Sequence, residues 1–267
     1  MRLSLTLTTT FIPSMRHMNA QFPGAINAQR LAYILIFLRS KIGSGKLSPI
    51  STKNGAFIKK SATFHFEAEL EYNQVAGVDE AGYGAWAGPV AVCAVMLNVE
   101  SFPEELKKVV YDSKYLNAKT RTYIHDTFIA NPRYGTFSIE MVWPEEIHYH
   151  NVLRATLYGM ERALMNLKPR PYHVLIDGPR SIPFLTKEIT QHPLIKGDQK
   201  SYSIAMASII AKVKRDTLMD TLHTHHQYYG WNTNKGYGTL KHTEALKVFG
   251  SCLHHRKGYK IKALKNI

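Results

Sequence analysis

The feature that most constrains the fold is the segment from residue 74 to residue 90, QVAGVDEAGYGAWAGPV. It begins with an apolar run that ends at two adjacent carboxylates, Asp79 and Glu80, and continues into a glycine-rich stretch. An apolar run that stops at Gly-Tyr-Gly predicts a buried strand ending at a turn. Acidic side chains at such a strand end, on a basic chain, are well placed to hold a divalent metal ion against a phosphate group.

From about residue 67 the chain has the pattern of a folded α/β domain. Short apolar runs predict strands, and apolar residues at helical spacing predict helices. We expect strands over residues 75–79, 90–97, 137–142 and 173–177, and helices over residues 118–129, 152–167 and 203–223. The length of 267 residues is enough to bury a substantial core. We therefore assign residues 67–267 to one domain.

The charge is distributed unevenly along the chain. The net charge of +14 favours a polyanionic partner such as nucleic acid. Residues 1–66 carry nine Lys and Arg residues and no Asp or Glu, whereas residues 67–252 carry 20 charges of each sign. Basic tails alone are a weak signal, because a run of charge is usually a solvated segment. We expect residues 1–66 to be a poorly ordered basic extension, either a targeting segment or an incorrectly assigned start.

The cysteines indicate a reducing compartment, and the hydropathy pattern bears on membrane association. Cys93 lies in an apolar run and is expected in the core, and no Cys-x-x-Cys pattern indicates a zinc site. Two cysteines form no disulfide framework, so we expect a reducing compartment, the cytoplasm. The apolar run over residues 31–38 is too short to span a bilayer, which takes roughly 20 residues. We expect a monomer without membrane association.

Two further acids, Asp177 and Asp198, follow a strand or lie in a turn. If they converge with Asp79 and Glu80, each pair of charges 4 Å apart repels by roughly 4 kcal/mol at an effective dielectric near 20. Such a cluster needs cations or raised pKa values, and oxygen ligands without His or Cys select Mg²⁺ or Mn²⁺. Successive strand residues point to opposite faces, so Asp79 and Glu80 share a site only where the strand ends or distorts. From spacing alone, ordinary acids at turns remain the alternative.

Eight short motifs in a fixed order resemble the ribonuclease HII family, the type 2 ribonucleases H, over residues 74–259. They are Ala76-Gly-Val-Asp-Glu-Ala-Gly82, Ala87-Gly-Pro-Val90, Asp112-Ser-Lys114 with Leu116, Ile176-Asp-Gly178, Lys196-Gly-Asp198, the helical segment 203–216, Lys235-Gly-Tyr-Gly-Thr239 and His255-Arg256. The resemblance implies an α/β fold of the ribonuclease H type. In that fold, a mixed five-stranded sheet is flanked by helices and followed by a helical C-terminal part.

The resemblance also implies an activity and a site. The activity is endonucleolytic cleavage of the RNA strand of RNA–DNA hybrids and of ribonucleotides embedded in duplex DNA, as in ribonucleotide excision repair. The products have 3′-hydroxyl and 5′-phosphate ends. Asp79, Glu80 and Asp177 match the metal ligands of the family, and Asp198 matches its fourth catalytic acid. Two Mg²⁺ or Mn²⁺ ions would serve phosphodiester hydrolysis at these residues.

Substrate contacts follow from the same resemblance. The Gly-Arg-Gly element of the family corresponds to Gly82, Tyr83 and Gly84, so a tyrosine replaces the arginine and supplies no cationic fork for a phosphate. This departure puts the grip on phosphate and the selectivity for the RNA–DNA junction in doubt. Tyr237 matches the tyrosine that packs on the sugar beyond the junction, and Asn234 stands where the family usually has His. Candidate phosphate contacts are Lys114, Lys212 and Arg215.

Two alternatives stay open beside this hypothesis. Tyr83 is compatible with a hybrid-binding protein that cleaves weakly, although four retained acids argue against a pure binder. The sister family, ribonuclease HIII, carries an N-terminal substrate-binding domain, and residues 1–66 could pose as one. The poor hydrophobic periodicity of these residues and the Asp-Glu-Ala-Gly motif favour ribonuclease HII. A trio of histidines (His223, His225 and His226) is expected to be a polar helix end rather than a metal cluster.

Overall fold

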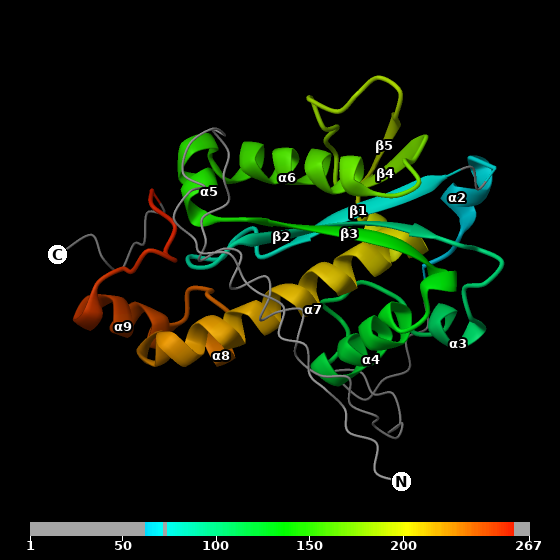
Figure 1. Cartoon of the computed structure of the whole chain (residues 1–267). Helices are drawn as coiled ribbons and strands as arrows, with labels where there is room; N and C mark the ends of the chain where they lie inside the picture. The colour runs from blue at the N-terminus through cyan, green and yellow to red at the C-terminus, as the bar shows by residue number, and fades with distance from the viewer. Residues whose placement is uncertain (1–61, 72–73, 259–267) are drawn as a thin grey trace, which may run out of the picture. The chain divides into compact units, whose positions relative to one another are not determined.

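The computed structural model describes residues 62–71 and 74–258 (Figure 1). All the described residues belong to one compact unit of the chain. The expected extension over residues 1–66 therefore lies outside the described residues except for residues 62–66. Within the described part of the chain, no helix is both long enough and apolar enough to cross a membrane.

A mixed five-stranded sheet with the order β3-β2-β1-β4-β5 forms the centre of the domain. Strands β1, β2 and β3 pair in antiparallel fashion, whereas β4 and β5 run parallel to β1. The five strands are β1 (Val75–Ala81), β2 (Val90–Leu97), β3 (Gly135–Val142), β4 (His173–Asp177) and β5 (Thr190–Leu194). Strand β2 is buried at nearly every position, which explains its continuous apolar sequence. The expected fold is confirmed; the polar edge strand β5 was not predicted.

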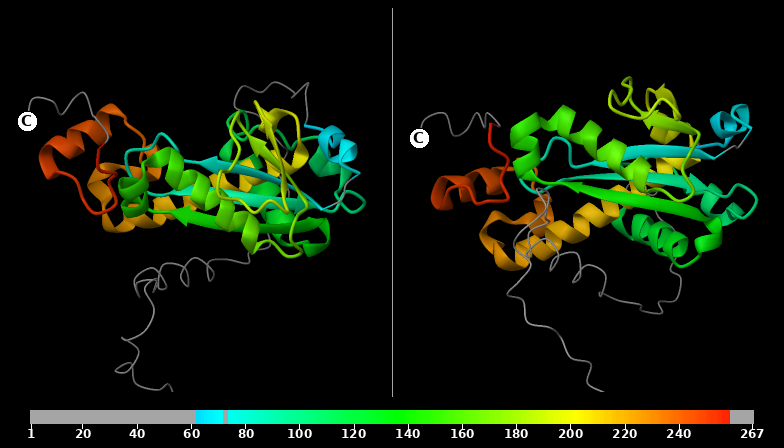
Figure 2. Two further views of the ribbon diagram at one scale, coloured as in Figure 1. Left: turned by 90° about the horizontal axis from the view of Figure 1, so that it is seen from above. Right: turned by 45° about the horizontal axis from the view of Figure 1, so that its top comes forward.

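Helices cover both faces of the sheet (Figure 1). One face carries α5 (Pro144–His150) and α6 (Val152–Asn166), and the view from above in Figure 2 shows α6 lying over the strands. The other face carries α3 (Glu104–Lys107), α4 (Ala118–Ile129) and α7 (Tyr202–His225). Helix α7 approaches β1 so closely that a Cβ on Gly77 would lie 2.3 Å from the backbone nitrogen of Ile204. A glycine at position 77 therefore permits this packing.

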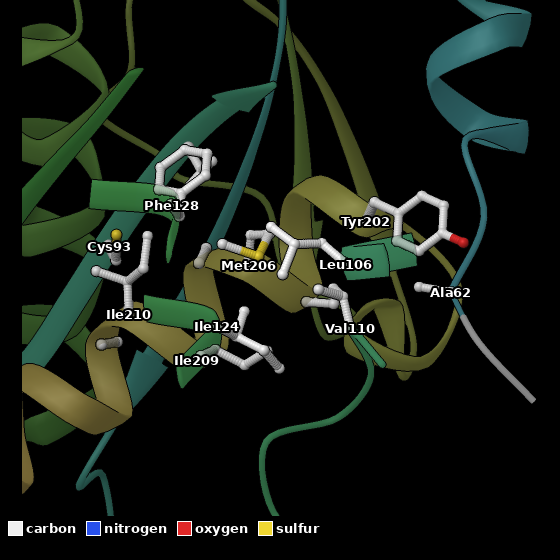
Figure 3. Packing of buried hydrophobic residues seen from close by; sticks show 14 of the residues in the cluster. Ala62, Cys93, Leu106, Val110, Ile124, Phe128, Tyr202, Met206, Ile209 and Ile210 are labelled. Carbon is white, nitrogen blue, oxygen red and sulfur yellow. The ribbon is translucent and has the colours of Figure 1, made fainter. Parts of the chain in front are cut away.

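Most buried apolar side chains form two large clusters, one on each side of the sheet, and a smaller cluster joins Val75, Leu175 and Ile204. Figure 3 shows the cluster beneath α7, where Met206 and Ile210 pack with Ile124 and Phe128 of α4. Cys93 of β2 is fully buried in this cluster, as expected for a core residue. These two clusters fix the sheet between its helical layers.

The C-terminal helical part packs against the loop between β1 and β2. It contains α8 (Trp231–Asn234), α9 (Leu240–Phe249) and the short 3-10 turn η3 (Gln227–Tyr229). The backbone nitrogens of Trp86 and Ala87 donate to the Gly236 carbonyl at 2.8 and 3.1 Å. The Gly88 nitrogen donates to the His254 carbonyl at 2.8 Å. The loop after the first acidic pair is thus held by residues about 150 positions later in the chain.

Three short elements complete the described chain: α2 (His65–Glu69), η1 (Pro132–Tyr134) and η2 (Gly197–Gln199). Residues 62–66, which precede the boundary expected at residue 67, pack onto the domain. Ala62 is fully buried, and the Phe64 ring meets the Tyr202 ring at 4.7 Å. The packed part of the chain therefore includes residues on the N-terminal side of that boundary.

Candidate active site

Three of the four expected acids converge where β1 and β4 run side by side. These two strands are parallel with Val78 opposite Ile176, so Asp79 of β1 lies beside Asp177, the last residue of β4. Asp198 enters from η2, which follows β5. One carboxylate oxygen from each of the three residues lies within 4.8 Å of the other two.

Glu80 lies at the edge of this group. Strand β1 does not end between the two adjacent acids, because its pairing with β2 continues to Ala81. The Glu80 carboxylate is not part of the 4.8 Å group, yet Asp177 and Asp198 raise its pKa and Lys114 lowers it. Glu80 therefore lies within electrostatic reach of the three acids.

The carboxyl groups of Asp79, Glu80 and Asp198 resist ionisation. Burial and the neighbouring charges of Glu80 and Asp177 raise the pKa of Asp79 well above its usual value. Burial, followed by Asp177, raises the pKa of Glu80 to about 7. Burial, followed by Asp112 and Asp177, raises the pKa of Asp198 to about 6. A divalent cation among these oxygens would relieve both the repulsion and the desolvation, so the donor set fits Mg²⁺ or Mn²⁺.

Lys114 brings a cation to the rim of the acidic group. Its Nζ lies 3.5 Å from Asp198 Oδ2 and 4.0 Å from Asp112 Oδ1, while its side chain is 77% exposed. Asp112 is buried and accepts from the Lys114 backbone nitrogen at 2.9 Å and from Gln199 Nε2 at 3.2 Å. Because the ammonium group is anchored on one side and open on the other, it can meet a substrate phosphate.

A pair of buried serines links this loop to Asp79. Ser113 Oγ and Ser208 Oγ lie 3.0 Å apart, and Ser208 lies close enough to the Asp79 carboxylate to lower its pKa. Ser208 lowers the pKa of Asp79, as expected of a hydroxyl that donates to the carboxylate, and Ser113 can in turn donate to Ser208. Sequence reasoning missed this link, although a serine among the small apolar residues of α7 was a signal.

Comparisons with known proteins agree with this geometry. The family model described as Ribonuclease HII matches residues 76–260. This chain belongs to the ribonuclease HII family. The Ribonuclease HII of Roseobacter denitrificans is 43% identical over 194 residues, which cover 72% of this chain and 92% of that protein. The Ribonuclease HII of Chlamydia muridarum is 43% identical over 188 residues, covering 70% and 82%.

Solved structures confirm the fold. The ribonuclease H2 of Pyrococcus horikoshii matches with a TM-score of 0.60 at 26% identity, over 70% of this chain and 93% of that one. A Bst-RNase HIII structure in complex with Mn²⁺ matches with a TM-score of 0.53 at 19% identity, over 66% and 62%, and shows the fold alone. The family match supports HII over the HIII alternative. Family membership makes this chain a hydrolase of the ribonuclease H type.

In this chain, a buried arginine holds the glycine loop, which we define as residues 82–84. Arg256 Nη2 donates to the Gly82 carbonyl and Nη1 to the Tyr83 carbonyl, both at 2.7 Å. Its Nε donates to the Gly88 carbonyl at 2.9 Å. The Tyr83 side chain is 38% exposed, and a Cβ on Gly84 would meet no atom within 4 Å. The loop therefore leaves open space beside Gly84, where a ligand could approach the backbone closely.

The structure corrects the expectation that Arg215 contacts phosphate. Arg215 is fully buried, and its guanidinium donates to the carbonyls of Pro89, Lys235 and Ala87 at 2.9, 2.9 and 3.1 Å. Burial lowers its pKa to about 10. Gly82, at φ 90°, has no room for a Cβ because the Arg215 side chain lies directly beneath it. Arg215 therefore has a structural role: its buried side chain supports the glycine loop.

The two remaining candidate contacts differ in exposure. Lys212 is partly buried and its Nζ lies 2.7 Å from Asp216 Oδ1, so it is engaged within α7. The Tyr237 ring is 38% exposed, and the Arg215 guanidinium carbon lies 5.4 Å from its centroid. Asn234 supports the turn that presents Tyr237, since its Oδ1 accepts from the Gly236 nitrogen at 2.8 Å. The Tyr237 ring is thus accessible, and its contact with a sugar stays a prediction.

Histidines form a buried aromatic cluster that sequence reasoning did not find. His242, His254 and His255 are buried around Trp231, and His242 Nε2 lies 3.1 Å from His255 Nε2. His226, expected at a polar helix end, packs its ring 5.4 Å from Trp231. Within the described residues the only grouping with metal-ligand spacing is the acidic one, so this cluster is a packing unit.

The histidine cluster predicts an acid-sensitive stability. Burial, followed by His226, lowers the pKa of His254 to about 4. Its folded pKa lies below the unfolded value near 6.5, so stability is lost as pH falls from about 6.5 toward 4. The loss from this one group is about 3 kcal/mol at most. Urea unfolding followed by tryptophan fluorescence at several pH values measures it.

The carboxyl groups with raised pKa values make the protein more stable as the pH falls, which is opposite to the effect of His254. The contribution of His254 is therefore measured by comparing the unchanged protein with a matched variant. His254→Gln keeps the carboxyl groups and removes the titrating imidazole. We expect its stability to fall less steeply below pH 6.5 than that of the unchanged protein. His148→Gln, at an exposed position on α5, should keep the original slope. Equal slopes in all three proteins would contradict a buried neutral His254.

Proposed function

We propose that the chain cleaves the RNA strand of RNA–DNA hybrids and cuts at ribonucleotides embedded in duplex DNA. The observation that carries this proposal is the convergence of Asp79, Asp177 and Asp198, with Glu80 at their edge and Lys114 at their rim. A purely binding protein would gain nothing from buried negative charge beside phosphate. The products we propose are a 3′-hydroxyl and a 5′-phosphate.

We assign the metal ligands to Asp79, Glu80 and Asp177, with Asp198 as the fourth acid. Two divalent ions bound there would supply an activated water and stabilise the leaving 3′-oxygen. The protein residues place the reacting groups. Asp177 Oδ1 accepts from the Gly197 nitrogen at 2.7 Å, which ties the end of β4 to the turn that carries Asp198. Lys114 would meet the phosphate from the exposed side, and the serine pair would hold Asp79 in place.

Recognition of the ribose belongs to the glycine loop and Tyr237. A 2′-hydroxyl is both donor and acceptor, and it distinguishes RNA from DNA. The open space beside Gly84 would let a sugar approach the backbone, while Tyr237 would pack against the next sugar. Tyr83 would stack on a sugar or donate through its hydroxyl, but it supplies no charge. We therefore propose cleavage at junctions with a weaker phosphate contact than an arginine would give.

The proposal is tested on duplexes of the same sequence in three forms: RNA–DNA, RNA–RNA and DNA–DNA. We expect cleavage of the RNA strand of the first duplex only, in Mg²⁺ or Mn²⁺, and none in a chelator. Mapping of the ends should give 3′-hydroxyl and 5′-phosphate groups. Metal-independent cleavage, or 2′,3′-cyclic phosphate ends, would refute the site assignment.

The hybrid-binding alternative is favoured by Tyr83 alone. It predicts tight binding of the hybrid in chelator with negligible turnover in Mg²⁺. The same duplexes separate the two functions, because binding and cleavage are measured on one substrate.

We further propose that the protein is a cytoplasmic monomer acting in ribonucleotide removal, in line with the cysteine usage that the sequence shows.

A further inference from the structure

A short N-terminal segment, residues 62–71, is tied to the start of α7 by a buried carboxylate. Glu67 of α2 is 3% exposed. Its Oε1 accepts from Ser201 Oγ at 2.7 Å and from the Ser203 backbone nitrogen at 3.1 Å, and it also accepts from Ser203 Oγ. Three donors from the first turn of α7 therefore converge on one oxygen of a residue more than 130 positions earlier.

The backbone of the same segment holds the same turn from a second side. The Thr63 nitrogen donates to the Lys200 carbonyl at 3.0 Å, and the Tyr202 nitrogen donates to the Thr63 carbonyl at 3.1 Å. Thr63 and Ser201 thus form an isolated parallel bridge. Residues 200–203 are fixed by both a side chain and a main chain of the N-terminal segment.

The turn held in this way carries Asp198. The nitrogens of Lys200 and Ser201 both donate to the Gly197 carbonyl at 2.9 Å, so Asp198 lies inside the closed turn. Lys196, just before it, has the left-handed φ of 57°. A shift of the Ser201–Ser203 backbone would therefore move the whole turn and the Asp198 carboxylate with it.

Electrostatic repulsion also acts on the turn, because its Asp198 carboxylate lies near other carboxylates. Asp198 is buried beside the like charges of Asp112 and Asp177. Among the described residues the ion pair of its carboxylate is with Lys114, whose side chain is 77% exposed and easily screened. Repulsion between carboxylates at a few ångströms is on the order of several kcal/mol. The Gly197 bond to Asp177 opposes this repulsion from one side of the turn, and the N-terminal segment opposes it from the other.

We propose that Glu67 is a positioning residue that holds Asp198 against Asp177 and so shapes the metal-binding group. The expected effect on cleavage rests on the proposed function. The expected effect on metal affinity is measured without substrate and does not depend on that function. Glu67 is buried and lies outside the acidic group. It acts through Ser201 and Ser203 on the η2 turn.

A purely structural role would give a different result. If Glu67 only capped α7, its loss would lower stability and leave metal affinity and turnover of the folded protein unchanged. Partners of metal ligands typically contribute about 10–100-fold to metal affinity or activity. Mn²⁺ affinity without substrate, measured by electron paramagnetic resonance of the free ion, therefore separates the two roles.

The experiment uses the full chain with three replacements of Glu67 and one control. Glu67→Ala removes the acceptor, Glu67→Gln keeps an oxygen at the same reach, and Glu67→Asp withdraws the carboxylate by one methylene. Glu69→Gln changes an exposed acid on the same helix, 57% exposed and paired with His65. Thermal unfolding, Mn²⁺ affinity, kcat and KM are measured for each protein.

We expect Glu67→Ala to weaken Mn²⁺ binding and to lower kcat by about tenfold each, with KM within about twofold of the original. Glu67→Gln should recover most of both quantities, Glu67→Asp should lie between Gln and Ala, and Glu69→Gln should match the unchanged protein. In an Asp198→Asn background, Glu67→Ala should cause no further loss, since the two changes act through one group.

The outcomes distinguish the inference from the proposed function. Cleavage by the unchanged chain together with normal Mn²⁺ affinity and kcat in Glu67→Ala would overturn the inference and leave the function standing. Absence of cleavage in the unchanged chain, with weakened Mn²⁺ binding in Glu67→Ala, would overturn the function and support the inference. If Glu67→Ala does not fold, Glu67→Asp decides, and normal Mn²⁺ affinity in that variant would overturn the inference.

Discussion

Replacing Asp79 by asparagine is expected to abolish cleavage and to stabilise the metal-free protein. The carboxylate belongs to the acidic group, so its loss would remove one of the proposed metal ligands and should lower kcat by about 10³-fold or more. Burial and the charges of Glu80 and Asp177 raise the pKa of Asp79 in the folded state. Its ionised form therefore costs stability at every pH above the unfolded pKa, and asparagine removes that cost.

The stabilising half of this prediction is measured by thermal unfolding in a chelator. We expect the melting temperature to rise by about 2–4 °C for each kcal/mol of relieved repulsion. Mg²⁺ or Mn²⁺ should raise the melting temperature of the unchanged protein more than that of Asp79→Asn. Glu105→Gln, an exposed acid on α3, is the matched control and should change neither quantity. Retained cleavage by Asp79→Asn would contradict the ligand assignment.

Removing the Arg215 side chain is expected to destabilise the protein strongly. Its guanidinium satisfies three backbone carbonyls from two distant segments and is fully buried. Arg215→Ala leaves these acceptors without a donor and opens a cavity, which together should cost about 3–5 kcal/mol of unfolding free energy. Urea unfolding at neutral pH measures the loss.

The control for that change is Arg180→Ala, which deletes an arginine from an exposed position in the loop after β4. Its unfolding free energy should stay within about 0.5 kcal/mol of the original. Arg215→Lys should fall between the two, because an ammonium group cannot reach all three carbonyls in one geometry. An Arg215→Ala variant with an unchanged free energy of unfolding would contradict the supporting role of Arg215.

The sequence was sufficient for the strand ends and their acids, because the relevant signals are local. The apolar run before Asp79 and the one before Asp177 each predict a buried strand, and the parallel pairing of β1 with β4 brings their ends together. Strand β5 was missed because Pro193 and its polar neighbours suit an edge strand that lacks a two-sided apolar pattern.

The roles of the buried polar residues could not be predicted from local patterns. Arg215 reads as a helix-surface cation, yet the carbonyls it satisfies lie up to 128 residues away in the chain. Glu67 marks a change in composition, which suggested a boundary there, whereas the structure shows it bonded to α7. His254 and His255 occur near a basic tail, and only the packing around Trp231 explains their burial. Long-range contacts decided each case.

The central claim is that this acidic site cuts at a ribonucleotide that the glycine loop recognises. The most direct test is a DNA duplex with a single embedded ribonucleotide, incubated with the full chain in Mg²⁺ or Mn²⁺ and compared with an all-DNA duplex and with the Asp79→Asn variant. The account predicts one cut, on the 5′ side of the ribonucleotide, and no cut in either control. Cleavage of a full RNA–DNA hybrid without any cut at the single ribonucleotide would contradict it.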